Sequence, residues 1–201
     1  MYLTDSSGWR PALMTLAAIV CLISSAVASD YEVGESYTGF KFGMIGSGSV
    51  ESGHSPIDQR AGFSTGFFFD QPFGPRLHYS LSVDLHKMSW RGQQPTYRWD
   101  KSEWLIDLGL NLKGNLLGEN SPIGLRPGVG AGVAFLGKME SAGVGGSSYV
   151  TVRMFTELIF LSSNDLMGLL EAGVWYAPSG GDNASDLSIG PLWTLRAGVM
   201  F

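Results

Sequence analysis

Apolar and polar residues alternate along most of the chain from about residue 38 onward. In the run Leu77–Arg91, the odd positions up to 85 are apolar, while the even positions between them carry histidine, serine and aspartate. A period of two is typical of β-strands. We therefore expect eight strands, at Thr38–Gly48, Ala61–Gln71, Leu77–Arg91, Glu103–Leu116, Ile123–Gly137, Ser148–Leu161, Leu166–Pro178 and Leu187–Phe201.

The strands are long and their connectors alternate in length. Each run holds about 10 residues or more, the length that a tilted strand needs to cross a bilayer. Tight turns are expected at Gln71–Arg76, Gly118–Pro122 and Ser162–Asp165, and longer polar loops at Ser49–Arg60, Gly92–Ser102, Lys138–Ser147 and Ser179–Asp186. The pattern predicts an all-β fold: an eight-stranded antiparallel up-and-down transmembrane β-barrel with short periplasmic turns and longer extracellular loops.

The two faces of the strands indicate which side is the lumen. One face is continuously apolar, which suits lipid, whereas the other is rich in glycine, serine and charges of both signs. A barrel of eight strands has an interior just wide enough for side chains to fill, so we expect a filled lumen in which buried charges are paired. The lumenal charges would be Lys41, Asp70, Asp84, His86, Asp107, Lys113, Arg126, Arg153, Glu157, Glu171 and Arg196.

The first 28 residues have the features of a cleaved signal peptide. Arg10 precedes the apolar stretch "ALMTLAAIVCLI", and "AVA" at 26–28 is a small-x-small cleavage site. We expect residues 29–37 to be a short periplasmic segment and residues 38–201 to be the barrel. The only cysteine, Cys21, would be removed with the signal, leaving no thiol in the mature chain. Export of this kind predicts a location in the bacterial outer membrane.

The chain ends on "TLRAGVMF", an alternating run closed by an aromatic residue. This ending resembles the C-terminal signal read by the outer-membrane assembly machinery. The residues that would carry the signal are Trp193, Leu195, Ala197, Val199 and Phe201, with Arg196 pointing inward.

Catalytic chemistry has one weak candidate. His78 and Ser80 lie two apart on one strand face, as a base and a serine nucleophile can. The pair falls on the lumenal face beside a tight turn, however, so we expect hydrogen-bonded lumen residues and no enzyme. A lipid A deacylase and a small channel are the alternative functions. No cofactor is expected, and no metal site, because Asp84 and His86 alone supply too few ligands.

The second long loop is the richest candidate for interactions. It carries arginines, a lysine and aromatic residues, which are favoured at interfaces and can meet lipopolysaccharide phosphates. These candidates are Arg91, Tyr97, Arg98, Trp99 and Lys101. A protein partner at the extracellular loops, outer-membrane lipid and lipopolysaccharide are therefore the expected partners. The net charge of −5 gives no support for a nucleic-acid partner, which would require a basic surface.

Three stretches carry a resemblance to a known family. They are "GFSTGFFFDQPFGPRLHYSLSVDLHKMSWRG" at Gly62–Gly92, "SEWLIDLGLNLKGNL" at Ser102–Leu116 and "IGLRPGVGAGVAFLG" at Ile123–Gly137. The chain resembles the small outer-membrane β-barrel domain family, in particular its PorT-like members, and OmpA- and OmpX-like barrels share the shape. The resemblance implies a non-enzymatic outer-membrane barrel with a structural or interaction role, and a link to protein secretion.

Overall fold

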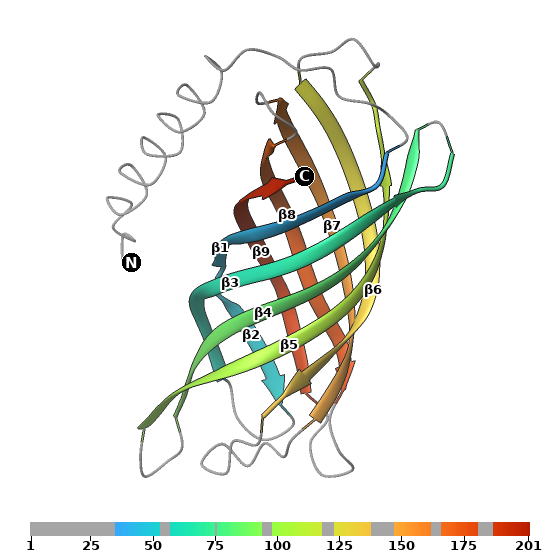
Figure 1. Cartoon of the computed structure of the whole chain (residues 1–201). Coiled ribbons are helices and arrows are strands. Elements are labelled where there is room, and N and C mark those ends of the chain that lie inside the picture. The colour runs from blue at the N-terminus through green and yellow to red at the C-terminus, as the bar shows by residue number, and fades with distance from the viewer. Residues whose placement is uncertain are drawn as a thin grey trace, which may run out of the picture.

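The computed structural model describes residues 35–52, 57–74, 76–93, 98–117, 123–137, 147–161, 166–180 and 187–201. This part of the chain folds into strands that wrap around a common axis (Figure 1). They are β1 (Tyr37–Ile45), β2 (Gly48–Ser52), β3 (Ile57–Pro72), β4 (Leu77–Gln93), β5 (Arg98–Gly114), β6 (Ile123–Leu136), β7 (Ser147–Leu161), β8 (Met167–Gly180) and β9 (Leu187–Met200). Within these ranges no helix is long and apolar enough to cross a membrane.

The sheet closes on itself, and every pairing between neighbouring strands is antiparallel. β1 and β2 are two segments of a single strand that breaks at residues 46–47, and both pair with β3 on one side and β9 on the other. Reciprocal backbone hydrogen bonds of 2.9 Å between Thr38 and Phe201 complete the closure. The wall is therefore an eight-stranded barrel, which confirms the predicted fold class.

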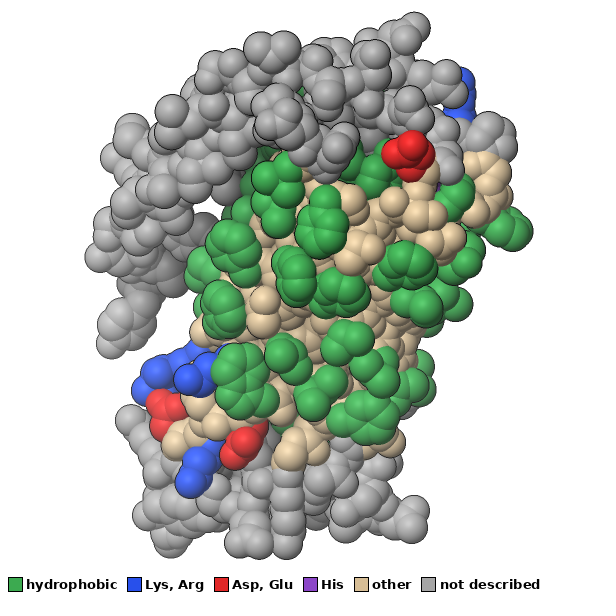
Figure 2. Space-filling view, viewed as in Figure 1, with side chains coloured by type: hydrophobic (Ala, Val, Ile, Leu, Met, Phe, Trp, Pro, Cys, Tyr) green, Lys and Arg blue, Asp and Glu red, His purple; other side chains and the backbone are tan. Residues whose placement is uncertain are grey.

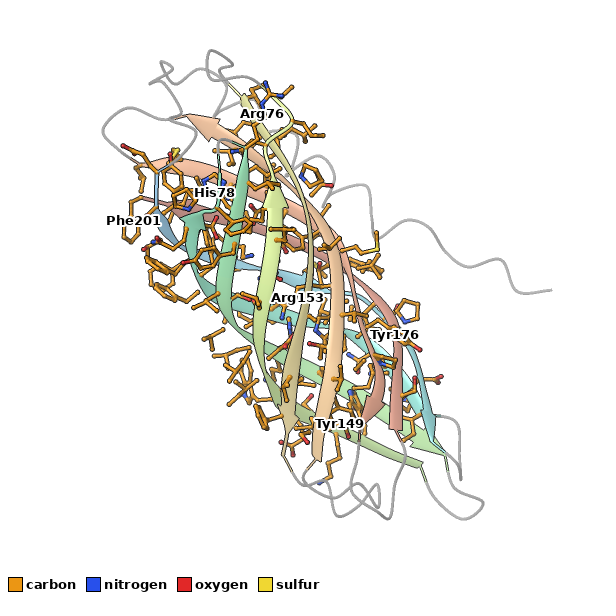
Figure 3. All side chains as sticks on the ribbon, turned by 90° about the vertical axis from the view of Figure 1, so that its right-hand side faces the viewer. Arg76, His78, Tyr149, Arg153, Tyr176 and Phe201 are labelled. Carbon is orange, nitrogen blue, oxygen red and sulfur yellow. The ribbon has the colours of Figure 1, made fainter. Side chains whose placement is uncertain are left out.

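The connections fall at two ends of the barrel, which we call the turn end and the loop end. The turn end holds the β3–β4, β5–β6 and β7–β8 connections together with Arg76, His78 and Phe201 (Figure 3). In the β3–β4 turn Gly74 has φ of +136°, a conformation that residues with a side chain rarely adopt. The loop end holds the other connections, including the β4–β5 hairpin (Figure 1).

Two of the expected long loops are wrong, because much of their length is strand. The segment predicted as the loop Ser49–Arg60 contains most of β2 and the start of β3, and β4 and β5 continue through Gln93 and from Arg98. Beyond the apolar belt the outward positions become polar, so the alternation fades from the sequence. The strands still continue there, because inward residues such as Val50, Ile57 and Trp90 remain buried and main-chain pairing resumes on the loop-end side of a register shift between Arg60 and Phe63.

An apolar belt covers the outer wall (Figure 2). Along β4 the predicted apolar face is exposed, with Leu81 at 54%, whereas the alternate positions from His78 to His86 are buried. The same division holds along β5, where Leu110 is 56% exposed and Asp107 is fully buried. Such an inside-out arrangement is that of a membrane barrel, with lipid as the solvent of the outer face.

Candidate functional site: charged lumen and loop-end rim

A network of charged side chains crosses the middle of the lumen. It contains five cations and five carboxylates, all of them buried: Lys41, Lys113, Arg126, Arg153, Arg196, Asp70, Asp84, Asp107, Glu157 and Glu171. Every strand of the wall except the short β2 contributes at least one of them. The charges are thus equal in number and come from all sides of the barrel.

Four of these residues form a closed ring toward the turn end. The Lys113 Nζ lies 3.0 Å from Asp70 Oδ1 and 2.9 Å from Glu157 Oε1. The Arg126 Nη2 lies 2.9 Å from Asp70 Oδ2 and 2.7 Å from Glu157 Oε2. Each carboxylate therefore receives both cations, which is the arrangement that buried charges require.

Lys41 links this ring to the rest of the charged network. Its Nζ lies 3.7 Å from Glu157 Oε1 and 2.6 Å from Glu171 Oε2. The ammonium groups of Lys41 and Lys113 also lie 5.0 and 4.6 Å from the centre of the Phe68 ring. The aromatic face adds a favourable contact for both cations in a site that excludes water.

The charged network continues toward the loop end through two arginines. The Arg196 Nε donates to Glu171 Oε1 at 2.8 Å, and its Nη1 donates to Asp84 Oδ1. Arg153, at mid-height in Figure 3, donates to Asp84 at 2.6 Å and to Asp107 at 2.8 Å. The Trp175 Nε1 also donates to Asp107, at 2.6 Å. Through Asp84 and Lys41, the residues Glu157, Glu171, Arg153 and Arg196 lie in one network.

Apolar clusters lie above and below the charged layer. The larger one, toward the loop end, comprises Ile45, Val50, Ile57, Met88, Trp90, Leu105, Ala134, Leu136, Tyr149, Trp175, Ala177, Ile189 and Leu192. The smaller one, toward the turn end, comprises Tyr37, Phe68, Ile159, Met167, Leu169 and Met200. Side chains therefore fill the lumen, and its charges are separated from water at both ends.

The larger apolar cluster is the feature that the sequence analysis missed. A signal for it was present, because Met88, Trp90 and Leu105 occupy lumenal positions of the alternating pattern. Most other lumenal positions are polar, so these three residues do not form an apolar pattern of their own in the sequence.

His78 and Ser80 are both fully buried in the lumen near the turn end. The Ser80 hydroxyl has no hydrogen-bond partner in the described part of the chain, so His78 does not bind it as a general base would. His86 is likewise buried, and its ring lies 5.8 Å from that of Trp175. No three histidine, cysteine or acidic side chains in the described ranges gather as metal ligands.

The loop-end rim carries exposed charges on the outer wall. The Arg60 Nη1 and Arg91 Nη2 lie 3.3 and 3.5 Å from Asp100 Oδ2, and all three side chains are about half exposed. Lys101 is exposed as well. Of the other predicted loop residues, Tyr97 and the side chains of Arg98 and Trp99 lie outside the part of the chain that is described.

The closing strand places its alternate residues as the pattern suggested. Trp193, Leu195 and Ala197 are half-buried, and Val199 and Phe201 are exposed at 40% and 54%. Arg196 points into the lumen. The ring of Trp193 covers the β1–β2 break, since a β-carbon on Gly46 would overlap it.

Similarity to known proteins lies in the fold and not in the sequence. No protein-family model matches the chain, and no curated protein does. Neisserial surface protein A (NspA) has a similar crystal structure, with a TM-score of 0.55 and 13% identity over 82% of this chain and 95% of that one.

Two structures of Ail, the attachment invasion locus protein of Yersinia pestis, both have a TM-score of 0.44, with coverage of 83% of this chain and 99% of Ail. The identity is 12% for one and 15% for the other, which is a complex with the heparin analogue sucrose octasulfate. None of these matches supports the narrower resemblance to PorT-like barrels. The chain therefore has the closed fold of a small eight-stranded outer-membrane barrel similar to NspA.

Proposed function

We propose that this protein is a non-enzymatic surface protein of the bacterial outer membrane. Its filled barrel is a rigid support, and its loop end faces outward to bind a partner. The apolar belt, the charge-balanced lumen and the signal-peptide pattern of the first 28 residues support this location. NspA, which shares the fold, is called a surface protein, and this adds support by analogy.

The observation that carries the proposal is the length of the β4–β5 hairpin. β4 and β5 pair along all 17 residues of each strand, up to Gln93 and Arg98. Pairing of β5 with β6 stops at Leu105 and Leu136 within the described residues. The hairpin projects past β6 at the loop end (Figure 1), whereas β3 pairs with β4 as far as Gly92.

The projecting part of β5, Arg98–Trp104, thus has a described strand partner on one side only. Main-chain groups along such an edge can pair with an extended segment of another protein. A hairpin with such an edge supports a role in contact between surfaces. The link to secretion has no comparison behind it and forms no part of the proposal.

The test is a shortened hairpin. Residues 91–100 are replaced by Asn-Gly, which suits a two-residue turn between paired strands. Bacteria that display the shortened barrel should lose binding to immobilised surface proteins that the wild type binds. Lys101→Gln is the matched control, because it removes a charge and keeps the hairpin. Unchanged binding by the shortened barrel, with normal heat-modifiable gel mobility, would contradict the proposal.

The same proposal separates this barrel from a channel. The paired charges and the apolar clusters at both ends leave no reason to expect a hydrated path. Reconstituted protein should therefore give no single-channel conductance in a planar bilayer. A stable open conductance would favour the channel.

A further inference from the structure

Three adjacent strands place cations and hydroxyls together on the outer wall at the loop end. We propose that this rim patch, formed by Arg60, Lys87, Ser89, Arg91 and Ser102, binds the phosphate of a membrane glycolipid. The inference rests on the proposed function, because it requires the loop end to face the outer leaflet.

Strand register brings the five residues together. Arg60 on β3 pairs with Ser89 on β4, which pairs with Ser102 on β5. Lys87 lies two residues from Ser89 toward the turn end, and Arg91 lies two residues toward the loop end. Positions two apart on a strand share a face, so the cations surround the serine pair.

The donors of the patch suit a phosphate group. The Ser89 and Ser102 hydroxyls are 2.7 Å apart at its centre. The guanidinium groups of Arg60 and Arg91 offer planar pairs of N–H donors, which match phosphate oxygens, and Lys87 adds an ammonium group. The Lys87 Nζ also lies 5.9 Å from the ring of Trp104, which holds it near the edge of the apolar belt.

Asp100 is the internal counter-ion of the patch. It accepts from Arg60 and Arg91 at 3.3 and 3.5 Å, with half-exposed side chains on both sides. Long, exposed ion pairs stabilise a protein little, so a phosphate with more charge and more acceptors can replace this one. Three cations face the two carboxylates of Asp58 and Asp100, and Figure 2 shows charged side chains gathered beside the belt at this end.

An apolar groove lies on the outer wall toward the turn end, and the exposed side chains of Leu85 and Ile106 lie between it and the patch. It has a volume of about 730 Å³, and its walls include Phe67, Val83, Leu108 and Val133. Val83 lies four residues before Lys87 on the same face of β4, about 13 Å along the strand toward the turn end. A cation cluster beside an apolar belt that leads to this groove fits a molecule with a phosphate head and acyl chains, rather than free phosphate or a soluble polyanion. In the outer leaflet such a molecule is the lipid A part of lipopolysaccharide.

The test measures binding of lipid A to the full chain folded in detergent micelles, by native mass spectrometry. The probes are diphosphorylated lipid A, its dephosphorylated form and inorganic phosphate. Wild-type protein should bind the diphosphorylated lipid. The triple variant Arg60→Gln, Lys87→Gln, Arg91→Gln should bind it roughly tenfold more weakly.

Lys101→Gln is the control, since this exposed lysine pairs in register with lumenal Trp90 and so lies on the other face of the hairpin. It should bind within twofold of wild type. Equal affinity of the triple variant and wild type, or of the two lipids, overturns the proposal. Competition by inorganic phosphate at the same concentration also overturns it, because the site would then recognise an ion and not a lipid.

The outcome is independent of the partner-binding test. Micelles have no sidedness, and the lipid measurement uses point variants that keep the full hairpin. Its result therefore does not depend on whether the shortened barrel, which lacks Arg91, still binds its partner. Conversely, loss of partner binding on shortening leaves the lipid measurement to decide on the rim patch alone. Failure of one proposal is therefore distinguishable from failure of the other.

Discussion

Asp84 shows at the level of single residues how the lumen tolerates charge. Its two carboxylate oxygens bind different arginines, Arg153 and Arg196, which come from β7 and β9. The carboxylate is fully buried, so contacts of this kind must offset its desolvation. Each arginine also binds one further carboxylate, Asp107 or Glu171.

We predict that Asp84→Ala destabilises the barrel by about 3 kcal/mol. This destabilisation is at the lower end of the range for removing one partner of a buried ion pair, because each arginine keeps one carboxylate. Urea titration of the protein refolded into lipid vesicles measures the difference. Asp58→Ala removes an exposed carboxylate and should change stability by no more than about 0.5 kcal/mol. A loss at Asp84 no larger than at Asp58 would show that the network contributes nothing.

Gly43 marks a close approach between β1 and β9. A β-carbon at this position would overlap the main-chain carbonyl of Leu195. We predict that Gly43→Ala costs about 1–3 kcal/mol, because one of the two closing strands must shift. Gly114→Ala is the control, since its added carbon would meet only a side-chain atom of Leu77 at 3.8 Å. Similar urea midpoints for the two variants would refute the close approach.

Among the strands, β9 combines closure of the barrel with the predicted assembly signal. Phe201 follows β9, and its backbone bonds Thr38 in both directions, while its ring remains exposed. The main chain therefore serves the folded barrel, whereas the ring is available to be read during assembly. Deleting the residue would remove both contributions at once.

Phe201→Ala separates them. We predict slower insertion into the outer membrane in cells, measured by the folded fraction on heat-modifiable gels. Stability of the barrel refolded in vitro should change by no more than about 1 kcal/mol. Normal insertion of this variant would argue against an assembly signal at the terminal aromatic.

The sequence predicted the strand positions wherever one face of the strand lies in the apolar belt and is apolar at every position. In β4 and β5 the alternation from residue 77 to 86 and from 104 to 113 matches the observed burial. Strand ends did not follow, because Gly48–Ser52 and Arg98–Ser102 lie where outward positions turn polar. In these segments the strand is maintained by pairing with neighbouring strands. The local pattern of apolar and polar residues does not indicate that pairing.

For the whole molecule, the solvent of the outer wall is the main physical constraint. The belt leaves Leu81, Leu110 and Phe42 more than half exposed, and a large exposed apolar surface is unfavourable in water. Lipid removes that cost. The closed hydrogen-bonded wall also leaves no strand edge in the hydrocarbon.

Ala131, on the outward face of β6, tests the membrane orientation. We predict that Ala131→Lys destabilises the barrel by about 2–4 kcal/mol in vesicles, because the ammonium lies near the middle of the bilayer. Ser148→Lys, on the outward face at the loop end of β7, should cost about 1 kcal/mol or less. Equal costs at the two positions would indicate that the outer wall does not face lipid.

Sequence alone determined which residues face inward at the level of the apolar belt, how many strands form the wall and that the lumenal charges balance. These follow from a period of two and from composition, which are local properties. Only the tertiary structure decided which charges meet, since Lys41 and Glu171 are 130 residues apart and their contact depends on register across the barrel. The apolar clusters at both ends and the projecting hairpin are likewise tertiary, because both depend on how far each strand extends past its neighbours.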